Sequence, residues 1–287
     1  MDLPYRGRFA PSPTGDLHLG SLLSAVASYL QARKNKGQWL IRIEDIDPPR
    51  EVAGSAAGII RDLKSLGMTA DEDISYQRQH TATYLQAVTS LLSAGKAFRC
   101  ACSRKQLKDS PVYPGTCRKL GLDAAAIRLR VDNRQMTVPD NLQKTREYSL
   151  NDDIGDFILW RADKLPAYQL AVVVDDAAEG ITEAVRGCDL LDSTPRQIYL
   201  QECLGLAHPE YLHIPLLTDN SGRKLSKRDR DDPLNQLQPV AAIRLALQLL
   251  GQQPPAEIID LDTLWNWAIG HWELKNIPLR LDNEYIT

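Results

Sequence analysis

Arg8-Phe9-Ala10-Pro11-Ser12-Pro13-Thr14-Gly15-Asp16-Leu17-His18-Leu19-Gly20-Ser21 is the segment from which the rest of the chain can be interpreted. Its first residues are apolar and predict the end of a strand. The two prolines prevent a strand or helix from continuing, because proline has a fixed φ and no N–H. From His18 onward apolar residues recur every three or four positions, which predicts a helix. A tight turn leading into a helix N-terminus exposes backbone N–H groups that attract anions, phosphates above all, although such turns are also common without a ligand.

A second segment, far downstream, is a basic loop that begins with glycine: Gly222-Arg223-Lys224-Leu225-Ser226-Lys227-Arg228. Taken alone, such a run is most simply a solvated basic turn. The chain contains neither the P-loop pattern G-x-x-x-x-G-K-[ST] nor the dinucleotide pattern G-x-G-x-x-G. Any phosphate binding must therefore use a different framework.

Together the two segments resemble a known family. His18-Leu19-Gly20-Ser21 resembles the HIGH signature of class I aminoacyl-tRNA synthetases, and residues 224–228 resemble their KMSKS signature. Residues 8–15 further resemble the glutamyl and glutaminyl branch. The resemblance implies an α/β fold with a Rossmann-like parallel sheet. It also implies catalytic roles for His18, Gly20 and Lys227, and ATP contacts from His18, Gly20, Ser21, Asp189, Lys224 and Lys227.

Composition is that of an ordinary globular protein. The chain has 287 residues, of which 43% are hydrophobic and 25% charged, and a net charge of −3. No apolar run approaches the ~20 residues of a membrane helix, and the N-terminus lacks a signal-peptide pattern, so we expect a cytoplasmic protein. Five cysteines do not form the framework of a secreted disulfide protein. The charge does not indicate a nucleic-acid binder, but a local basic face is compatible with it.

The first part of the chain alternates predicted strands and helices. Residues 38–44 read as a buried strand that runs into the acidic Glu44-Asp45-Ile46-Asp47. Residues 52–66 and 81–94 read as helices that end at glycines. Such alternation is typical of a doubly wound parallel sheet, in which ligands bind at the carboxyl ends of the strands. The acidic residues are equally compatible with a simple exit from strand to loop.

The resemblance also implies a glutamate site. Glu44 matches the glutamate that holds the substrate's ammonium group, and Tyr168 and Arg186 match positions that recognise the substrate. A guanidinium binds a carboxylate with two hydrogen bonds, so Arg8 is expected to help from the other side, although a strand-end arginine is more often a surface ion pair. Val172 stands where the branch commonly has a polar residue, which indicates a somewhat different pocket. The implied glutamate-binding residues are Arg8, Ala10, Ser12, Glu44, Tyr168 and Arg186.

Three cysteines indicate a candidate metal site. Cys100 and Cys102 are separated by one residue, and Cys117 follows. Zinc needs four ligands in a tetrahedron, so the fourth would be Tyr113, Asp109 or water. Buried or free thiols are the alternative. The glutamyl-queuosine members of the branch have a similar Cys-x-Cys…Tyr…Cys set, and that resemblance assigns Tyr113 as the fourth ligand.

We expect four regions along the chain. Residues 1–96 and 163–217 would form the two halves of the Rossmann catalytic domain, with strands over 126–132 and 148–160 in an inserted zinc-containing module at 97–162. The sheet would resume over residues 166–176 and 180–187. Residues 218–287 would form the KLSKR loop and a helical region that contacts the tRNA stem, without an anticodon-binding domain. Further predicted elements are helices at 195–204, 240–250 and 261–269 and a strand at 213–217, while Cys188 and Cys203 are expected in the core.

The resemblance implies the function. We expect ATP-dependent activation of L-glutamate, followed by its transfer to the cyclopentenediol of queuosine at the wobble position of tRNA(Asp). Structural Zn²⁺, and Mg²⁺ bound with ATP, would accompany this reaction, in a monomer that contacts no membrane. The inserted module would contact RNA. The alternatives are a glutamyl-tRNA synthetase, or its catalytic fragment, that charges the 3′ end of tRNA, and a non-catalytic module that binds tRNA or a protein partner.

Overall fold

The computed structural model describes residues 4–103, 105–107, 110, 112–217, 234 and 237–281. Two parallel sheets form its centre. In the first, the strand order is β1 (Arg6–Phe9), β2 (Gln38–Ile43) and β3 (Ser75–Tyr76). In the second, β9 (Glu183–Gly187) pairs with β10 (Glu210–Ile214). The N–H of Thr182 donates to the carbonyl of Arg6 at 2.9 Å, so β9 begins alongside β1. The predicted α/β class is confirmed, but each parallel sheet is small.

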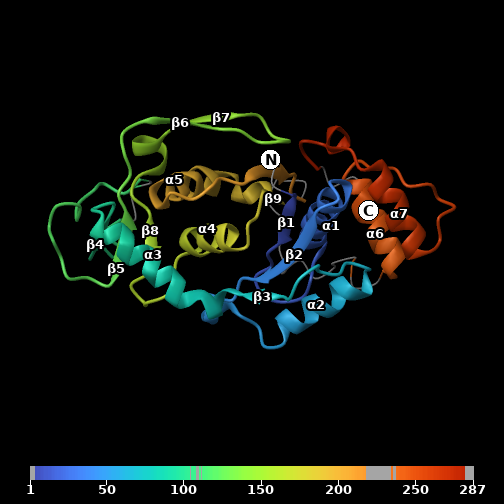
Figure 1. Cartoon of the computed structure of the whole chain (residues 1–287), viewed down its shortest axis with the longest axis horizontal. Helices are drawn as coiled ribbons and strands as arrows, with labels where there is room; N and C mark the ends of the chain where they lie inside the picture. The colour runs from blue at the N-terminus through green and yellow to red at the C-terminus, as the bar shows by residue number, and fades with distance from the viewer. Residues whose placement is uncertain are drawn as a thin grey trace.

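Helices cover this centre, and most lie where the periodicity predicts them. Figure 1 shows α1 against the parallel strands and α6 and α7 at the end of the molecule that contains the C-terminal residues. The predicted helices at 52–66, 81–94, 195–204, 240–250 and 261–269 are present with shifts of up to three residues. The helices are α1 (Leu19–Lys34), α2 (Ser55–Ser65), α3 (Thr81–Ser93), α4 (Tyr168–Ala178), α5 (Thr194–Leu204), α6 (Pro239–Leu249) and α7 (Leu261–His271), with short 3₁₀ turns at Pro48–Arg50, Gln77–His80, Cys188–Ser193 and Leu274–Asn276.

The segment expected to resume the sheet is instead the helix α4. Residues 170–176 are all buried, so this helix has no polar face and its apolar residues show no helical period in the sequence. A run of three valines therefore looks like a buried strand. After β8 the chain continues with the helix α4, and the next strand is β9.

The inserted region is antiparallel, as predicted. Its sheet has the order β4 (Ala97–Cys100), β5 (Ala126–Leu129) and β8 (Ile158–Trp160). A hairpin of β6 (Gln135–Val138) and β7 (Arg146–Ser149) extends from it and lies beside α5 (Figure 1). The expected strand at 148–160 is interrupted by a π-helical turn at Leu150–Ile154, which Gly155 closes with a positive φ of 61°. The boundaries of the four regions stay a prediction.

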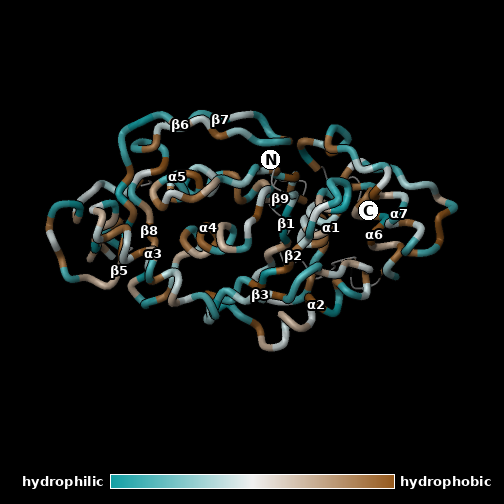
Figure 2. The backbone as a smooth tube through the Cα atoms, in the orientation of Figure 1, coloured by the Kyte–Doolittle hydropathy of each residue, from teal (hydrophilic) through white to brown (hydrophobic). Residues whose placement is uncertain are grey.

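Two hydrophobic clusters form the core. The first joins α1, β1 and β2 with α2, α6 and α7, and its fully buried Trp39 donates to the Ser28 hydroxyl at 2.9 Å. The second joins α3, α4 and α5 with the strands of the insertion. Figure 2 shows brown turns in α4, whereas the β6–β7 hairpin is mostly teal. Among the described residues, no helix is both long and apolar enough to cross a membrane.

Candidate functional site

The N-terminus of α1 is built as the sequence predicts. His18 is the N-cap, with φ −114° and ψ 164°, and its Nδ1 accepts from the N–H of Ser21 at 3.2 Å. Because Nδ1 accepts in this arrangement, the neutral ring has its proton on Nε2, which lies 2.9 Å from the Ser21 hydroxyl. A Cβ on Gly20 would lie 3.2 Å from Cε1 of His18. Glycine at position 20 thus leaves room for the imidazole to lie over the start of the helix.

Glu44 and Tyr168 lie at the ends of different elements and act on each other electrostatically. Glu44 follows β2, and its N–H donates to the carbonyl of Pro11 at 2.9 Å, which fastens the proline turn to the strand end. Burial raises the pKa of Glu44 to about 7, against the opposing effect of Arg42 and Arg8. Tyr168 is the first residue of α4, and burial raises its pKa although Arg186 lowers it. The structure therefore brings these predicted residues into one site.

Arg186 has a buried nitrogen without a hydrogen-bond partner among the described residues, as does Arg42 at its Nε. Its side chain is buried in β9, where Nε donates to Nε2 of His213 at 3.0 Å and Nη2 donates to the hydroxyl of Thr194 at 2.9 Å. The remaining nitrogen, Nη1, is buried and has no hydrogen-bond partner among the described residues. An unpaired charged donor is costly in a protein interior, so Nη1 is suited to a bound carboxylate.

The guanidinium of Arg8 forms an ion pair with a carboxylate of the protein. Its Nε and Nη2 donate to the two carboxylate oxygens of Asp176 at 3.0 and 3.2 Å, and both side chains are buried. Asp176 also accepts from Arg42 at 2.7 Å. Burial would raise the pKa of Asp176, but the two guanidinium groups lower it below its ordinary value. Nε and Nη2 of Arg8 are therefore paired with Asp176, while its Nη1 lies 3.5 Å from the carbonyl of Val185. The role of Arg8 in holding the substrate stays a prediction.

The structure describes three of the other residues implied by the resemblance, Ala10, Ser12 and Asp189. Ala10 is half-buried after β1, and Ser12 is exposed, with its carbonyl accepting from the N–H of Thr14 at 2.8 Å. Asp189 is exposed in the turn that follows β9, and its Oδ1 lies 2.7 Å from where a Cβ on Gly187 would be. Lys224 and Lys227, with the whole segment Gly222–Arg228, lie outside the described residues.

The three predicted cysteines converge. The Sγ atoms of Cys100, Cys102 and Cys117 lie within 4.8 Å of one another. The hydroxyl of Tyr113 is 3.4 Å from Sγ of Cys100 and 3.6 Å from Sγ of Cys102. Three thiols and one phenol oxygen around a common point are a donor set that fits tetrahedral zinc. Of the two other candidates for the fourth ligand, Asp109 lies outside the described residues.

The two cysteines outside the cluster, Cys188 and Cys203, are less buried than expected. All five cysteines are free. Cys188 and Cys203 were expected in the core, but each is only half-buried. Cys203 packs at the edge of the second hydrophobic cluster.

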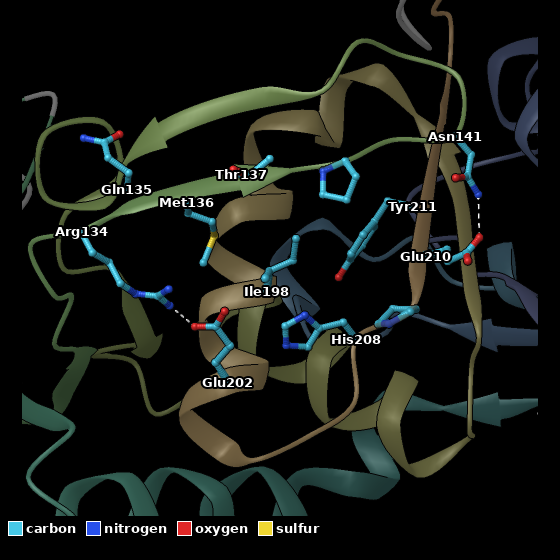
Figure 3. A pocket seen from close by; sticks show the side chains of 12 residues that line it. Arg134, Gln135, Met136, Thr137, Asn141, Ile198, Glu202, His208, Glu210 and Tyr211 are labelled. Carbon is cyan, nitrogen blue, oxygen red and sulfur yellow. Dashed lines mark hydrogen bonds and ion pairs between the residues drawn. The ribbon is translucent and has the colours of Figure 1, made fainter.

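A separate cavity of about 500 Å³ lies under the β6–β7 hairpin. Figure 3 shows Tyr211 pointing into it, with an Arg134–Glu202 pair on one side and an Asn141–Glu210 hydrogen bond on the other. None of the predicted site residues lines this cavity. It is distinct from the site at the strand ends.

Sequence reasoning missed three residues that hold the site together. Asp176 binds Arg8, while His213 and, behind it, Asp140 hold Arg186. No motif marks these residues, and Asp140 lies 73 positions before His213. Only the folded arrangement brings them together.

Comparisons with known proteins agree with this geometry. The family described as "tRNA synthetases class I (E and Q), catalytic domain" matches residues 5–112 and 118–247. The chain is 48% identical to a protein of Chromobacterium violaceum named glutamyl-Q tRNA(Asp) synthetase, over 96% of this chain and 95% of that one. A protein of the same name from Pseudomonas aeruginosa PAO1 is also 48% identical, over 97% of each.

Solved structures show the same relationship. The glutamate tRNA ligase of Elizabethkingia meningosepticum, solved in complex with its amino acid, superposes with a TM-score of 0.83 and 26% identity, covering 99% of this chain and 68% of that chain. A putative arginyl-tRNA synthetase from Campylobacter jejuni, 13% identical with a TM-score of 0.53, shares the fold. The chain belongs to the class I tRNA synthetase family of the E and Q type, through its catalytic domain.

Proposed function

We propose that this protein activates L-glutamate with ATP and transfers the glutamyl group to the cyclopentenediol of queuosine in tRNA(Asp). The observation that supports glutamate most directly is the buried, unpartnered Nη1 of Arg186, beside Tyr168 and on the same site as Glu44. Such a site offers a positive group to the side-chain carboxylate and a negative group to the ammonium. The acceptor follows from the names of the relatives that are 48% identical over nearly the whole chain.

The activation step depends on positioning and electrostatics. The attacking carboxylate of glutamate is already ionised at neutral pH, since its ordinary pKa is about 4.3 or lower. The difficulty is to bring it to the α-phosphate of ATP while charge develops on the leaving pyrophosphate. In our proposal the N–H groups at the start of α1 and Nε2–H of His18 donate to phosphate oxygens. Lys227, outside the described residues, would neutralise the triphosphate, with Mg²⁺ bound to ATP as substrate.

Zinc would have a structural role at the cysteine cluster. The cluster lies with Phe98 and Leu122 in a small hydrophobic group of the insertion, separate from the two main cores. So small a group buries little apolar surface, and a metal would connect β4 to the loop that contains Tyr113 and Cys117. We assign Cys100, Cys102, Tyr113 and Cys117 as its ligands.

A second candidate is charging of the 3′ end of tRNA(Glu). The superposition on a solved protein named a glutamate tRNA ligase supports it, because the two chains share the core. The two candidates share glutamate activation and differ only in the acceptor.

The test is transfer of radiolabelled glutamate, with ATP, to tRNA(Asp) that contains or lacks queuosine and, in parallel, to tRNA(Glu), followed by nuclease mapping. We expect label on the wobble nucleotide only when queuosine is present. Label on the terminal adenosine of tRNA(Glu) would instead support the second candidate. Without any glutamate-dependent exchange between ATP and pyrophosphate, both would be rejected.

A further inference from the structure

The partners of His213 determine which of its ring nitrogens donates a hydrogen bond and which accepts one. His213 is fully buried in β10, with its Nδ1 2.5 Å from Oδ2 of Asp140 and its Nε2 3.0 Å from Nε of Arg186. A carboxylate only accepts hydrogen bonds and a guanidinium only donates them. The ring must therefore donate from Nδ1 and accept at Nε2. His213 is neutral in this arrangement, in agreement with the lowering of its pKa by burial.

Asp140 is itself rigidly held. Its Oδ1 accepts from the N–H groups of Leu142 and Gln143 at 3.0 and 2.7 Å, which fixes the turn that follows β6. Burial would raise the pKa of Asp140, but the hydrogen bonds from His213 and from these N–H groups lower it. The carboxylate is thus ionised at neutral pH and can only accept.

The same turn is attached to β10 by its backbone. The N–H of Asn141 donates to the carbonyl of Tyr211 at 2.8 Å, and its side-chain amide donates to Glu210 at 2.9 Å, as Figure 3 shows. Nε2 of Gln143 donates to the carbonyl of His213 at 2.9 Å. The hairpin of the insertion therefore contacts the strand next to the one that contains Arg186.

Arg186 is held on its remaining sides. Tyr211 places its ring 5.0 Å from the guanidinium carbon, and Thr194 accepts from Nη2. With Nε and Nη2 occupied, Nη1 is the nitrogen that stays available to a ligand. The orientation of Nη1 thus depends on which side of the His213 ring has the proton.

We propose that Asp140 and His213 are positioning residues for substrate recognition: Asp140 holds His213 as the Nδ1–H tautomer, and His213 in turn fixes the guanidinium of Arg186 toward the side-chain carboxylate of the substrate. This proposal rests on the proposed glutamate specificity. It makes the turn between β6 and β7 part of the support of the amino-acid site.

Asp140→Asn tests the proposal. The amide oxygen must stay on the N–H groups of Leu142 and Gln143, so its NH₂ group faces Nδ1 of His213. The ring must then accept at Nδ1 and move its proton to Nε2, where it meets the N–H of Arg186. We expect the KM for glutamate in ATP–pyrophosphate exchange to rise by about 10-fold to 100-fold, the effect of losing a hydrogen bond to a charged group, with kcat and the KM for ATP unchanged.

Two further measurements separate this effect from a loss of structure. Long-range ¹⁵N–¹H spectra should show His213 as the Nδ1–H tautomer in the wild type and as Nε2–H in Asp140→Asn. His213→Gln, whose side-chain oxygen can still accept from Arg186, should keep the KM for glutamate much closer to wild type than His213→Leu. Asp153→Asn removes a carboxylate of the turn that follows β7, where it accepts from the N–H of Ser149, and should change nothing.

The outcomes are distinct. Wild-type exchange with glutamate tests the proposed function alone. An unchanged tautomer or an unchanged KM for glutamate in Asp140→Asn would overturn the positioning proposal, as would equal KM values for His213→Gln and His213→Leu. A parallel rise in the KM values for glutamate and ATP would also overturn it, since that pattern indicates a general loss of structure.

Discussion

The carboxyl group of Glu44 changes its charge near neutral pH, and this has a direct consequence for substrate binding. Its pKa is raised to about 7 in the ligand-free protein, with burial as the main cause. A substrate ammonium group binds the ionised form. Protons therefore compete with glutamate below about pH 7, and the KM for glutamate should be about 10-fold higher at pH 6 than at pH 8. Steady-state ATP–pyrophosphate exchange across this range measures the effect.

Glu44→Gln is the control for this pH dependence. The amide cannot ionise, so its KM for glutamate should be high at every pH and nearly constant between pH 6 and 8. If the wild-type KM were as flat as that of the variant, Glu44 would not be the group that binds the ammonium. A dependence in the opposite direction would contradict the assignment equally.

Residue-level prediction succeeded where a motif marks a position and failed where the partner is distant in sequence. The end of the strand at Glu44 and the cap at His18 follow from local patterns and are confirmed. The capture of Arg8 by Asp176 could not be predicted, because the two lie 168 positions apart. The resemblance also implied a contact between Arg8 and the substrate carboxylate, and that contact stays a prediction.

At the scale of elements, buried ion pairs join α4 to two strands of the first parallel sheet. Asp176 on α4 binds Arg8 of β1 and Arg42 of β2, all three buried. Asp176→Asn would leave the buried guanidinium of Arg8 facing a neutral amide, whereas Arg42 would keep its ion pair with Glu179 at 2.6 Å. We expect a loss of about 3 to 5 kcal/mol in the free energy of unfolding, measured by urea denaturation.

A matched control for Asp176→Asn is the exposed pair Arg6–Glu72, which also joins elements distant in sequence. Glu72→Gln should cost less than about 1 kcal/mol, because solvent screens exposed ion pairs. A loss in Asp176→Asn no larger than that in Glu72→Gln would show that the buried network does not stabilise the fold.

The cysteine cluster gives an element-scale prediction about metal. Cys100 lies at the end of β4, whereas Cys117 lies in the loop that precedes β5, so a shared ion would connect them. Cys100→Ser should lower the zinc content found by elemental analysis and lower the melting temperature, while glutamate activation falls less. Cys203→Ser, in α5 and away from the cluster, should keep the wild-type zinc content. Equal zinc contents in the two variants would rule out the proposed site.

Two segments were predicted as strands but contain helical structure, and in both the reason is packing or local hydrogen bonding. Periodicity identifies a helix only when one face is polar, and α4 is buried over residues 170–176. The turn at Leu150–Ile154 is stabilised by a local hydrogen bond, in which the N–H of Ser149 donates to the carboxylate of Asp153 at 2.7 Å. Both features arise from packing and local hydrogen bonds, whereas amphipathic helices such as α2 and α6 were predictable from spacing alone.

At the scale of the whole molecule, β9 and β10 lie between the two hydrophobic clusters. Val185 and Leu212 pack in the first cluster, whereas their neighbours Ala184 and Tyr211 pack in the second. Glu44 follows β2 of the first cluster, and Tyr168 begins α4, which is buried in the second. A ligand that binds both residues therefore links the two clusters.

This arrangement predicts that one ligand protects both clusters together. A non-hydrolysable glutamyl-adenylate analogue at about 100 times its Kd should stabilise the protein by about 2.7 kcal/mol. Amide hydrogen exchange should slow in β2 and in α4 to a similar degree, because opening either cluster would lose the ligand. ATP alone, which does not fill the glutamate site, should protect the start of α1 more than α4. Protection by the analogue in only one cluster would show that the two halves open independently, and that the ligand does not connect them.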